Sequence, residues 1–218
     1  MHEVTPDYLA ARQYAYAVFQ RLLGEEPTAE LLGAVDVDVL GDALQIVCGE
    51  ASGDALCELR AQLTGAAGRA ESLAAEYTRL FVGPAALPAL PWESVYTTHR
   101  RLVMQRSTLD VRGCYRAQGF IPALYPHVPD DHVALELDFL ATLATAALEA
   151  QAAGDEAACR EKLEASRAFA HDHLGAWVDQ YAAELAEKGG SAFYGAVARA
   201  AAALVACDAA VLGEVLAP

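Results

Sequence analysis

Few residues in this sequence could carry out chemistry, and they lie far apart. His132 and Glu136 are four positions apart, so on a helix they share a face and could form a charged contact or, alternatively, supply two metal ligands. His171 and His173 are two positions apart and would point in different directions on a helix, which favours structural roles. No cysteine or third histidine has a spacing that completes a metal site. We therefore expect no metal centre and no bound cofactor.

The motifs of common enzyme classes are absent. The sequence contains no G-x-S-x-G, G-x-x-x-x-G-K-[ST], G-x-G-x-x-G or H-E-x-x-H pattern. Its five cysteines are widely spaced with no C-x-x-C pair, which indicates reduced, mostly buried thiols. Cys48 and Cys57 have no nearby base, so we expect core residues rather than nucleophiles. A binding protein is favoured over an enzyme, and a metal- or nucleotide-dependent hydrolase that uses His132 and Glu136 is the alternative.

Composition points to one all-helical domain. The 218 residues are rich in alanine, a strong helix former, and suffice for a single core over residues 1–218. The formal net charge of −15 disfavours nucleic acid and anionic membranes as partners and suits a basic partner, although solubility alone also explains it. The start of the chain lacks the pattern of a secretory leader, and the longest stretches without charged residues (80–92 and 117–129) are too short to span a membrane. We expect a cytoplasmic protein.

Two apolar, proline-rich segments interrupt the helical pattern. They are "FVGPAALPALPWESVY" at 81–96 and "GFIPALYPHVP" at 119–129, and together they hold six of the nine prolines. Prolines break helices, and a solvated loop rarely carries this much apolar surface. Both segments are therefore candidates for a binding surface.

Helical periodicity and end signals predict the elements around these segments. Thr5 and Pro6 start a helix that Gly24 closes, and short acidic helices follow over 25–58. A helix over 67–82 ends at Gly83. "WESVYTTHRRLVMQRS" is predicted to be helical, and Ser107 with Asp110 to form the capping box of a helix that ends near 119. Further helices are expected over 130–153, 155–187 and 191–216.

Three segments resemble one protein family. "EYTRLFVGPAALPALPWESVY" resembles the E-Y-x-x-L-F-x-G-P and P-P-W/Y-x-S-V-Y hallmark of the TorD/DmsD/NarJ redox-enzyme maturation chaperones. "PDDHVALELDFLATL" is similar to P-x-D-H-x-x-x-E-L-x-F-x-x-x-L, and "FAHDHLGAWVDQYAAEL" with "AFYGAVARAA" is similar to F-x-x-x-H-L-x-x-W and a following F-Y helix. The segments keep the family's order from residue 76 to about residue 200. Leu90-Pro91 departs from the two prolines that are common in the family.

The resemblance implies an all-α, multi-helix bundle of the TorD-like type. It implies a cytoplasmic chaperone, monomeric or homodimeric, that binds the twin-arginine leader and the apo-form of a molybdopterin-containing oxidoreductase subunit. Such a chaperone assists cofactor insertion and delays export. The W-E-S-V-Y ending resembles the TorD/DmsD branch. A NarJ-type assembly factor for a nitrate reductase and a permanent subunit of a complex are the alternatives.

A twin-arginine leader has a basic start and an apolar middle, so its receptor needs an apolar trough next to carboxylates. The expected trough residues are Phe81, Leu87, Leu90, Trp92 and Tyr96. The expected polar contacts are Glu93, Ser94, Asp130, Asp131, His132 and Glu136. Burial of about 400 Å² of apolar surface is worth about 10 kcal/mol before association costs, against about 0.2–1 kcal/mol for an exposed ion pair. Apolar contact would therefore supply affinity, and the acids selectivity.

Several of these residues also have a structural interpretation. Phe81 continues a regular apolar stripe and could belong to the core. Ser94 or Asp131 could cap a helix, and Glu136 could simply orient His132.

Overall fold

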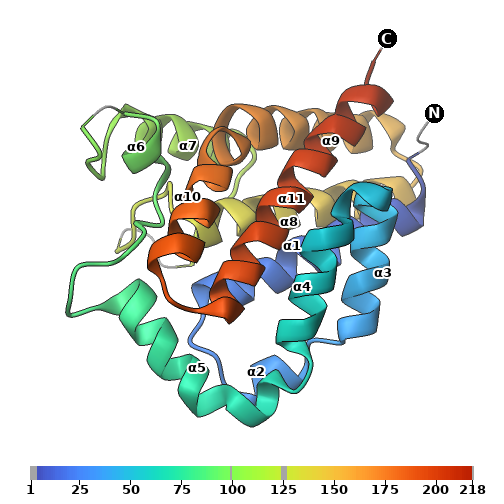
Figure 1. Ribbon diagram of the computed structural model, residues 1–218. Coiled ribbons are helices and arrows are strands. Elements are labelled where there is room, and N and C mark those ends of the chain that lie inside the picture. The colour runs from blue at the N-terminus through green and yellow to red at the C-terminus, as the bar shows by residue number, and fades with distance from the viewer. Residues whose placement is uncertain (1–3, 99, 124–126, 218) are drawn as a thin grey trace.

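The computed structural model describes residues 4–98, 100–123 and 127–217, and these residues form a bundle of helices (Figure 1). The N-terminal elements are α1 (Pro6–Gly24), α2 (Ala29–Gly33), α3 (Val37–Cys48), η1 (Gly49–Ser52), α4 (Gly53–Leu63), η2 (Ala66–Arg69), α5 (Ala70–Tyr77) and η3 (Thr78–Val82). The remaining elements are α6 (Glu93–Tyr96), α7 (Arg106–Ala117), α8 (Val133–Ala152), α9 (Glu156–Phe169), η4 (Ala170–Leu174), α10 (Gly175–Lys188) and α11 (Ala192–Val215). The predicted all-α fold is confirmed.

Helix α1 and helix α11 form the centre of the bundle. α1 packs along α8, and α11 packs against α10, α4 and α3 (Figure 1). The predicted start of α1 is confirmed, because Thr5 Oγ1 accepts a hydrogen bond of 3.1 Å from the Tyr8 amide and Pro6 takes the first helical position. The alanine-rich face of α11 lets neighbouring helices approach closely.

A buried ion pair joins α1 to α11. Asp208 on α11 accepts a hydrogen bond of 2.6 Å from Arg12 Nε, and both side chains are fully buried. The hydroxyl groups of Tyr8 and Tyr16 each donate to the same carboxylate at 2.8 Å. These four side chains satisfy most of one another's polar atoms inside an otherwise apolar core.

One helix among the described residues is long and apolar enough to cross a membrane. It is α11, Ala192–Val215, and 67% of its apolar window is buried inside the protein. A buried core helix of a soluble protein has the same composition, so length and hydropathy alone do not indicate insertion.

Three local predictions are wrong. The predicted helix over 92–107 shrinks to α6, because the backbone takes left-handed conformations at Arg101 (φ 48°) and Met104 (φ 59°), which no helix contains. The predicted capping box is absent, since α7 begins at Arg106 and Ser107 lies inside it. Cys57, expected in the core, is exposed.

Candidate functional site

The first proline-rich segment meets the residues that directly follow the second one, at a place that we call the loop crossing (residues 91–94 and 131–133). The Glu93 amide donates to the Asp131 carbonyl and the Val133 amide to the Pro91 carbonyl, each at 2.9 Å. Trp92 and His132 form an antiparallel bridge between these bonds, and their ring centroids are 5.4 Å apart in an edge-to-face arrangement. Both side chains stay partly exposed. The chain thus brings the end of the first segment against the start of α8; Pro126 of the second segment lies outside the described residues.

Two successive residues, Asp131 and His132, supply the caps of both helices at the loop crossing. Asp131 Oδ2 accepts a hydrogen bond of 2.9 Å from the Ser94 amide, so Asp131 caps α6 across 37 positions of sequence. His132 caps α8, because its Nδ1 accepts a hydrogen bond of 3.1 Å from the Ala134 amide. Ser94 therefore receives a cap rather than providing one. These two caps fix the direction in which α6 and α8 leave the crossing.

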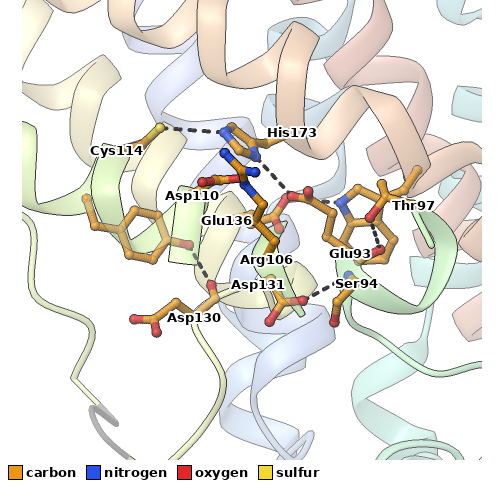
Figure 2. Close-up of polar contacts among 12 residues, drawn as sticks. Glu93, Ser94, Thr97, Arg106, Asp110, Cys114, Asp130, Asp131, Glu136 and His173 are labelled. Atoms are coloured by element: carbon orange, nitrogen blue, oxygen red, sulfur yellow. Dashed lines mark hydrogen bonds and ion pairs between the residues drawn. The ribbon is translucent and has the colours of Figure 1, made fainter. Parts of the chain in front are cut away.

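All four predicted carboxylates are buried. The exposed fraction is 3% for Glu93, 1% for Asp130 and 0% for both Asp131 and Glu136. A carboxylate at the start of a helix is usually exposed, but Asp131 is buried because its side chain lies against the Ser94 amide of α6. Figure 2 shows Glu93 turned towards His173, whereas the carboxylate of Asp130 points away from the other three acids. Whether they contact a peptide stays a prediction, because each already has a partner inside the protein.

Glu93 pairs with His173 on η4. His173 Nδ1 lies 3.1 Å from Glu93 Oε2, and its Nε2 lies 3.5 Å from the sulfur of Cys114 on α7 (Figure 2). Burial disfavours the imidazolium, but hydrogen bonds with Cys114 and Glu93 and the charge of Glu93 outweigh it and raise the pKa of His173 to about 10. At neutral pH the pair is a buried imidazolium–carboxylate contact that ties η4 to α6.

The position of His173 depends on a π-helical turn. η4 is such a turn between α9 and α10, and its widened backbone re-aims the side chains it carries. Gly175 closes it, because a Cβ there would lie 2.3 Å from the carbonyl oxygen of Ala170. η3, which leads into the first connection, is also a π-helical turn.

Glu136 is bound by Trp177 rather than by His132. The indole Nε1 of Trp177 donates to Glu136 Oε2 at 3.1 Å, so the expected contact of Glu136 with His132 gives way to a partner on α10. Burial and the nearby charge of Glu93 raise the pKa of Glu136 well above its ordinary value. Burial also lowers the pKa of His132 to about 4, so that this ring is neutral at physiological pH.

Several buried polar atoms around the loop crossing have no hydrogen-bond partner among the described residues. They are Trp92 Nε1, Ser94 Oγ, Asp131 Oδ1 and Glu136 Oε1. Unpaired buried polar atoms are uncommon in folded proteins and often mark functional sites. Here two of them are carboxylate oxygens, which accept donors such as guanidinium groups.

Asp130 forms the edge of a hollow next to the crossing. Its carboxylate accepts a hydrogen bond of 2.8 Å from Arg112 Nε, and its carbonyl accepts one of 2.9 Å from the Tyr115 hydroxyl. The hollow measures about 250 Å³ and has a mostly apolar wall. Its lining residues are Arg112, Tyr115, Arg116, Phe120, Ile121, Pro122 and Asp130.

The predicted apolar residues are partly exposed, in contrast to the acids. This set is Phe81, Leu87, Leu90, Trp92 and Tyr96. Phe81 packs in a separate aromatic cluster, with ring centroids 4.9 Å from Tyr77 and 5.1 Å from Tyr194. Tyr96 stacks on Trp177 at 5.4 Å. The exposed apolar surface and the buried carboxylates thus form two layers.

The residues that hold the acids were not predicted as part of the site. Arg112, Cys114 and Tyr115 lie on α7, and His173 and Trp177 lie on η4 and α10. His173 and Trp177 occupy the H and W positions of the F-x-x-x-H-L-x-x-W pattern, so that pattern was an available signal. No comparable pattern marked the α7 residues. Among the described residues, no group of three or more His, Cys, Asp or Glu side chains could hold a metal ion.

Comparison with known proteins gives consistent matches. The sequence model of the family described as nitrate reductase delta subunit matches residues 49–183. The chaperone protein TorD of Vibrio cholerae is 32% identical over 136 residues, which cover 62% of this chain and 60% of that protein. The Tat proofreading chaperone DmsD of Salmonella typhi is 38% identical over 74 residues, which cover 34% of this chain and 36% of DmsD. The matched region thus spans less than two thirds of these relatives.

Proposed function

Because the chain belongs to the nitrate reductase delta subunit family, the TorD/DmsD/NarJ family that its motifs resemble, we propose that it is a maturation chaperone for a redox enzyme. It would act in the cytoplasm without catalysing a reaction, binding the twin-arginine leader and the apo-form of a molybdopterin-containing oxidoreductase subunit. The chaperone names of its TorD and DmsD relatives support this proposal.

The loop crossing is the observation that carries the proposal. Two of the three family motifs come together there through paired backbone hydrogen bonds, and they leave the Trp92 and His132 rings partly exposed. An aromatic surface held by a rigid backbone loses little entropy when an apolar peptide segment binds. The formal net charge of −15 favours the approach of a basic leader.

Because the acids are buried, they do not form an exposed acidic rim around the apolar residues. The partly exposed apolar residues would contact the apolar middle of the leader. Of these residues, Leu87, Leu90 and Trp92 lie in the part of the first proline-rich segment that leads into the loop crossing. Asp131 and Glu136 would take up arginines only if the crossing opens, and their unpaired oxygens would then gain donors.

The test uses the two tryptophans of the chain. Trp177 is fully buried and Trp92 is partly exposed, so acrylamide should quench Trp92 preferentially. Synthetic twin-arginine leaders from the same genome should bind in calorimetry and protect Trp92 from quenching. A matched set with both arginines changed to glutamine should bind more weakly. If no leader binds, the proposal is wrong; if leaders bind Trp92→Ala as tightly as wild type, the site lies elsewhere.

The same binding assay would identify the client enzyme. The family description favours a nitrate reductase, whereas the TorD and DmsD relatives favour the other branch. A leader panel that includes every molybdopterin subunit of the genome distinguishes the two by affinity.

A further inference from the structure

The carboxylate of Glu184 on α10 is held in position to bind a cation. Its side chain is only 12% exposed, and its carboxylate accepts a hydrogen bond of 2.9 Å from the Tyr96 hydroxyl and one of 2.6 Å from Arg101 Nη2. Lys188 also donates to it. Partial burial would raise the pKa of Glu184, but the bonds from Lys188, Arg101 and Tyr96 outweigh it and lower the pKa to about 2. The group is therefore a carboxylate under all physiological conditions.

The shape of this site suits a guanidinium. The Arg101 guanidinium carbon lies 5.2 Å from the centroid of the Tyr96 ring, so one group contacts both a carboxylate and an aromatic face. Arginine makes both contacts better than lysine does, because its planar group stacks on rings. Trp177 supports the Tyr96 ring from its stacked position and fixes its orientation.

The segment that contains Arg101 has the same order of basic and apolar residues as a twin-arginine leader. Residues 100–104 read Arg-Arg-Leu-Val-Met, two consecutive arginines followed by three apolar residues. Those apolar side chains are exposed to 50%, 40% and 67%. Monomeric proteins seldom leave consecutive large apolar side chains in water without a binding role. The left-handed backbone at Arg101 and Met104 adds local strain that the contact with Glu184 must overcome.

We propose that Glu184 and Tyr96 form an arginine subsite of the leader-binding surface, and that residues 100–104 occupy it as an internal competitor. This inference rests on the proposed function. The Arg101 side chain is 53% exposed, and an exposed ion pair is weak enough to exchange. Tyr96 and Lys188, in contrast, stay with Glu184 when Arg101 leaves. A leader arginine would replace Arg101 and release the segment.

The experiment measures the dissociation constant of one synthetic leader for wild type and four variants. Removing the competitor in Arg101→Ala should tighten binding about three- to thirtyfold, the worth of an exposed ion pair plus a cation–π contact. Glu184→Gln should weaken binding by a similar factor. The double variant should lose the gain of Arg101→Ala. The control Arg160→Ala breaks an exposed ion pair near the C-terminus and should leave the constant unchanged.

The peptide supplies a second, independent readout. A leader with both arginines changed to glutamine should gain nothing from Arg101→Ala, because it has no guanidinium for the vacated subsite. Arg101→Gln repeats the test if the alanine variant folds poorly, as circular dichroism would show. If wild type binds the leader but Arg101→Ala binds it equally or more weakly, Arg101 is only a structural tie and this inference is wrong while the proposed function stands. Absence of binding by every protein overturns both.

Discussion

The buried pair of His173 and Glu93 allows the sharpest test of how the loop crossing is held. The two side chains are 13% and 4% exposed and lie 3.1 Å apart. Changing His173 to glutamine keeps a polar side chain of similar length but leaves the Glu93 charge buried without its cationic partner. Removal of one partner from a buried pair typically costs about 3–5 kcal/mol. For a domain of this size that corresponds to a fall in Tm of roughly 6–20 °C.

The stability that His173 contributes should depend on pH in a defined direction. The groups that face His173 are Glu93 on α6, Cys114 on α7 and Glu136 on α8. The pKa of His173 rises from 6.5 in the unfolded chain to about 10 in the fold. Its contribution to stability is therefore complete below pH 6.5 and is lost as the pH rises towards 10, with a magnitude on the order of 5 kcal/mol. The gap between wild type and variant should narrow over that range.

The assay is urea unfolding followed by circular dichroism at pH 6, 8 and 9.5. His171→Gln is the matched control, because His171 lies two positions away on η4 and its side chain is 78% exposed, beside Asp172. It should change the free energy of unfolding by less than about 0.5 kcal/mol. A loss below about 1 kcal/mol for His173→Gln at pH 6, or a gap that stays constant up to pH 9.5, would refute the reasoning.

Two further predictions concern the caps at the crossing. Asp131→Ala removes the acceptor of the buried Ser94 amide and should lower stability by about 1–2 kcal/mol in thermal unfolding, whereas Asp131→Asn keeps an oxygen and should lose less; equal losses would contradict the capping role. His132, whose pKa burial lowers to about 4, contributes stability above pH 6.5 that is lost as the pH falls towards 4. His132→Gln should therefore flatten the stability profile between pH 6.5 and 4 in urea titrations, and an unchanged slope would contradict it.

The long helices were predictable because their signals are local. Thr5 and Pro6 mark the start of α1, and the apolar period continues until Gly24. Ala192–Val215 has strong helix formers (Ala, Leu, Arg or Glu) at 14 of its 24 positions, so its propensity and its environment agree. In such segments the residues that decide the structure lie within four positions of one another.

The segment 97–105 could not be predicted in the same way. Its residues favour a helix, but Arg101 pairs with Glu184, 83 positions later in the sequence. Differences in helix propensity are below about 1 kcal/mol per residue, and the tertiary surroundings of a segment routinely override them. Only the folded chain brings α10 next to the end of α6.

The burial of the acids has the same origin. A carboxylate at the start of a helix is usually exposed, and the sequence around Asp130 and Asp131 gives no contrary sign. What buries them are donors from other elements: Arg112 and Tyr115 on α7 and the Ser94 amide on α6. The motifs contain the residues of the loop crossing, but they do not show which of these residues are buried and which are partly exposed.

Because the site has a buried polar layer and a partly exposed aromatic layer, substitutions in the two layers should have different effects on stability and on leader affinity. Trp92 and His132 are placed by backbone hydrogen bonds, and those bonds depend on the caps and ion pairs beneath them. A substitution in the buried layer should therefore change stability and leader affinity together. A substitution of Trp92, whose side chain caps no helix, should change affinity at nearly constant stability, because its ring touches the peptide without holding the frame. Measured side by side, the two classes separate the residues that contact a leader from those that hold the contacts in place.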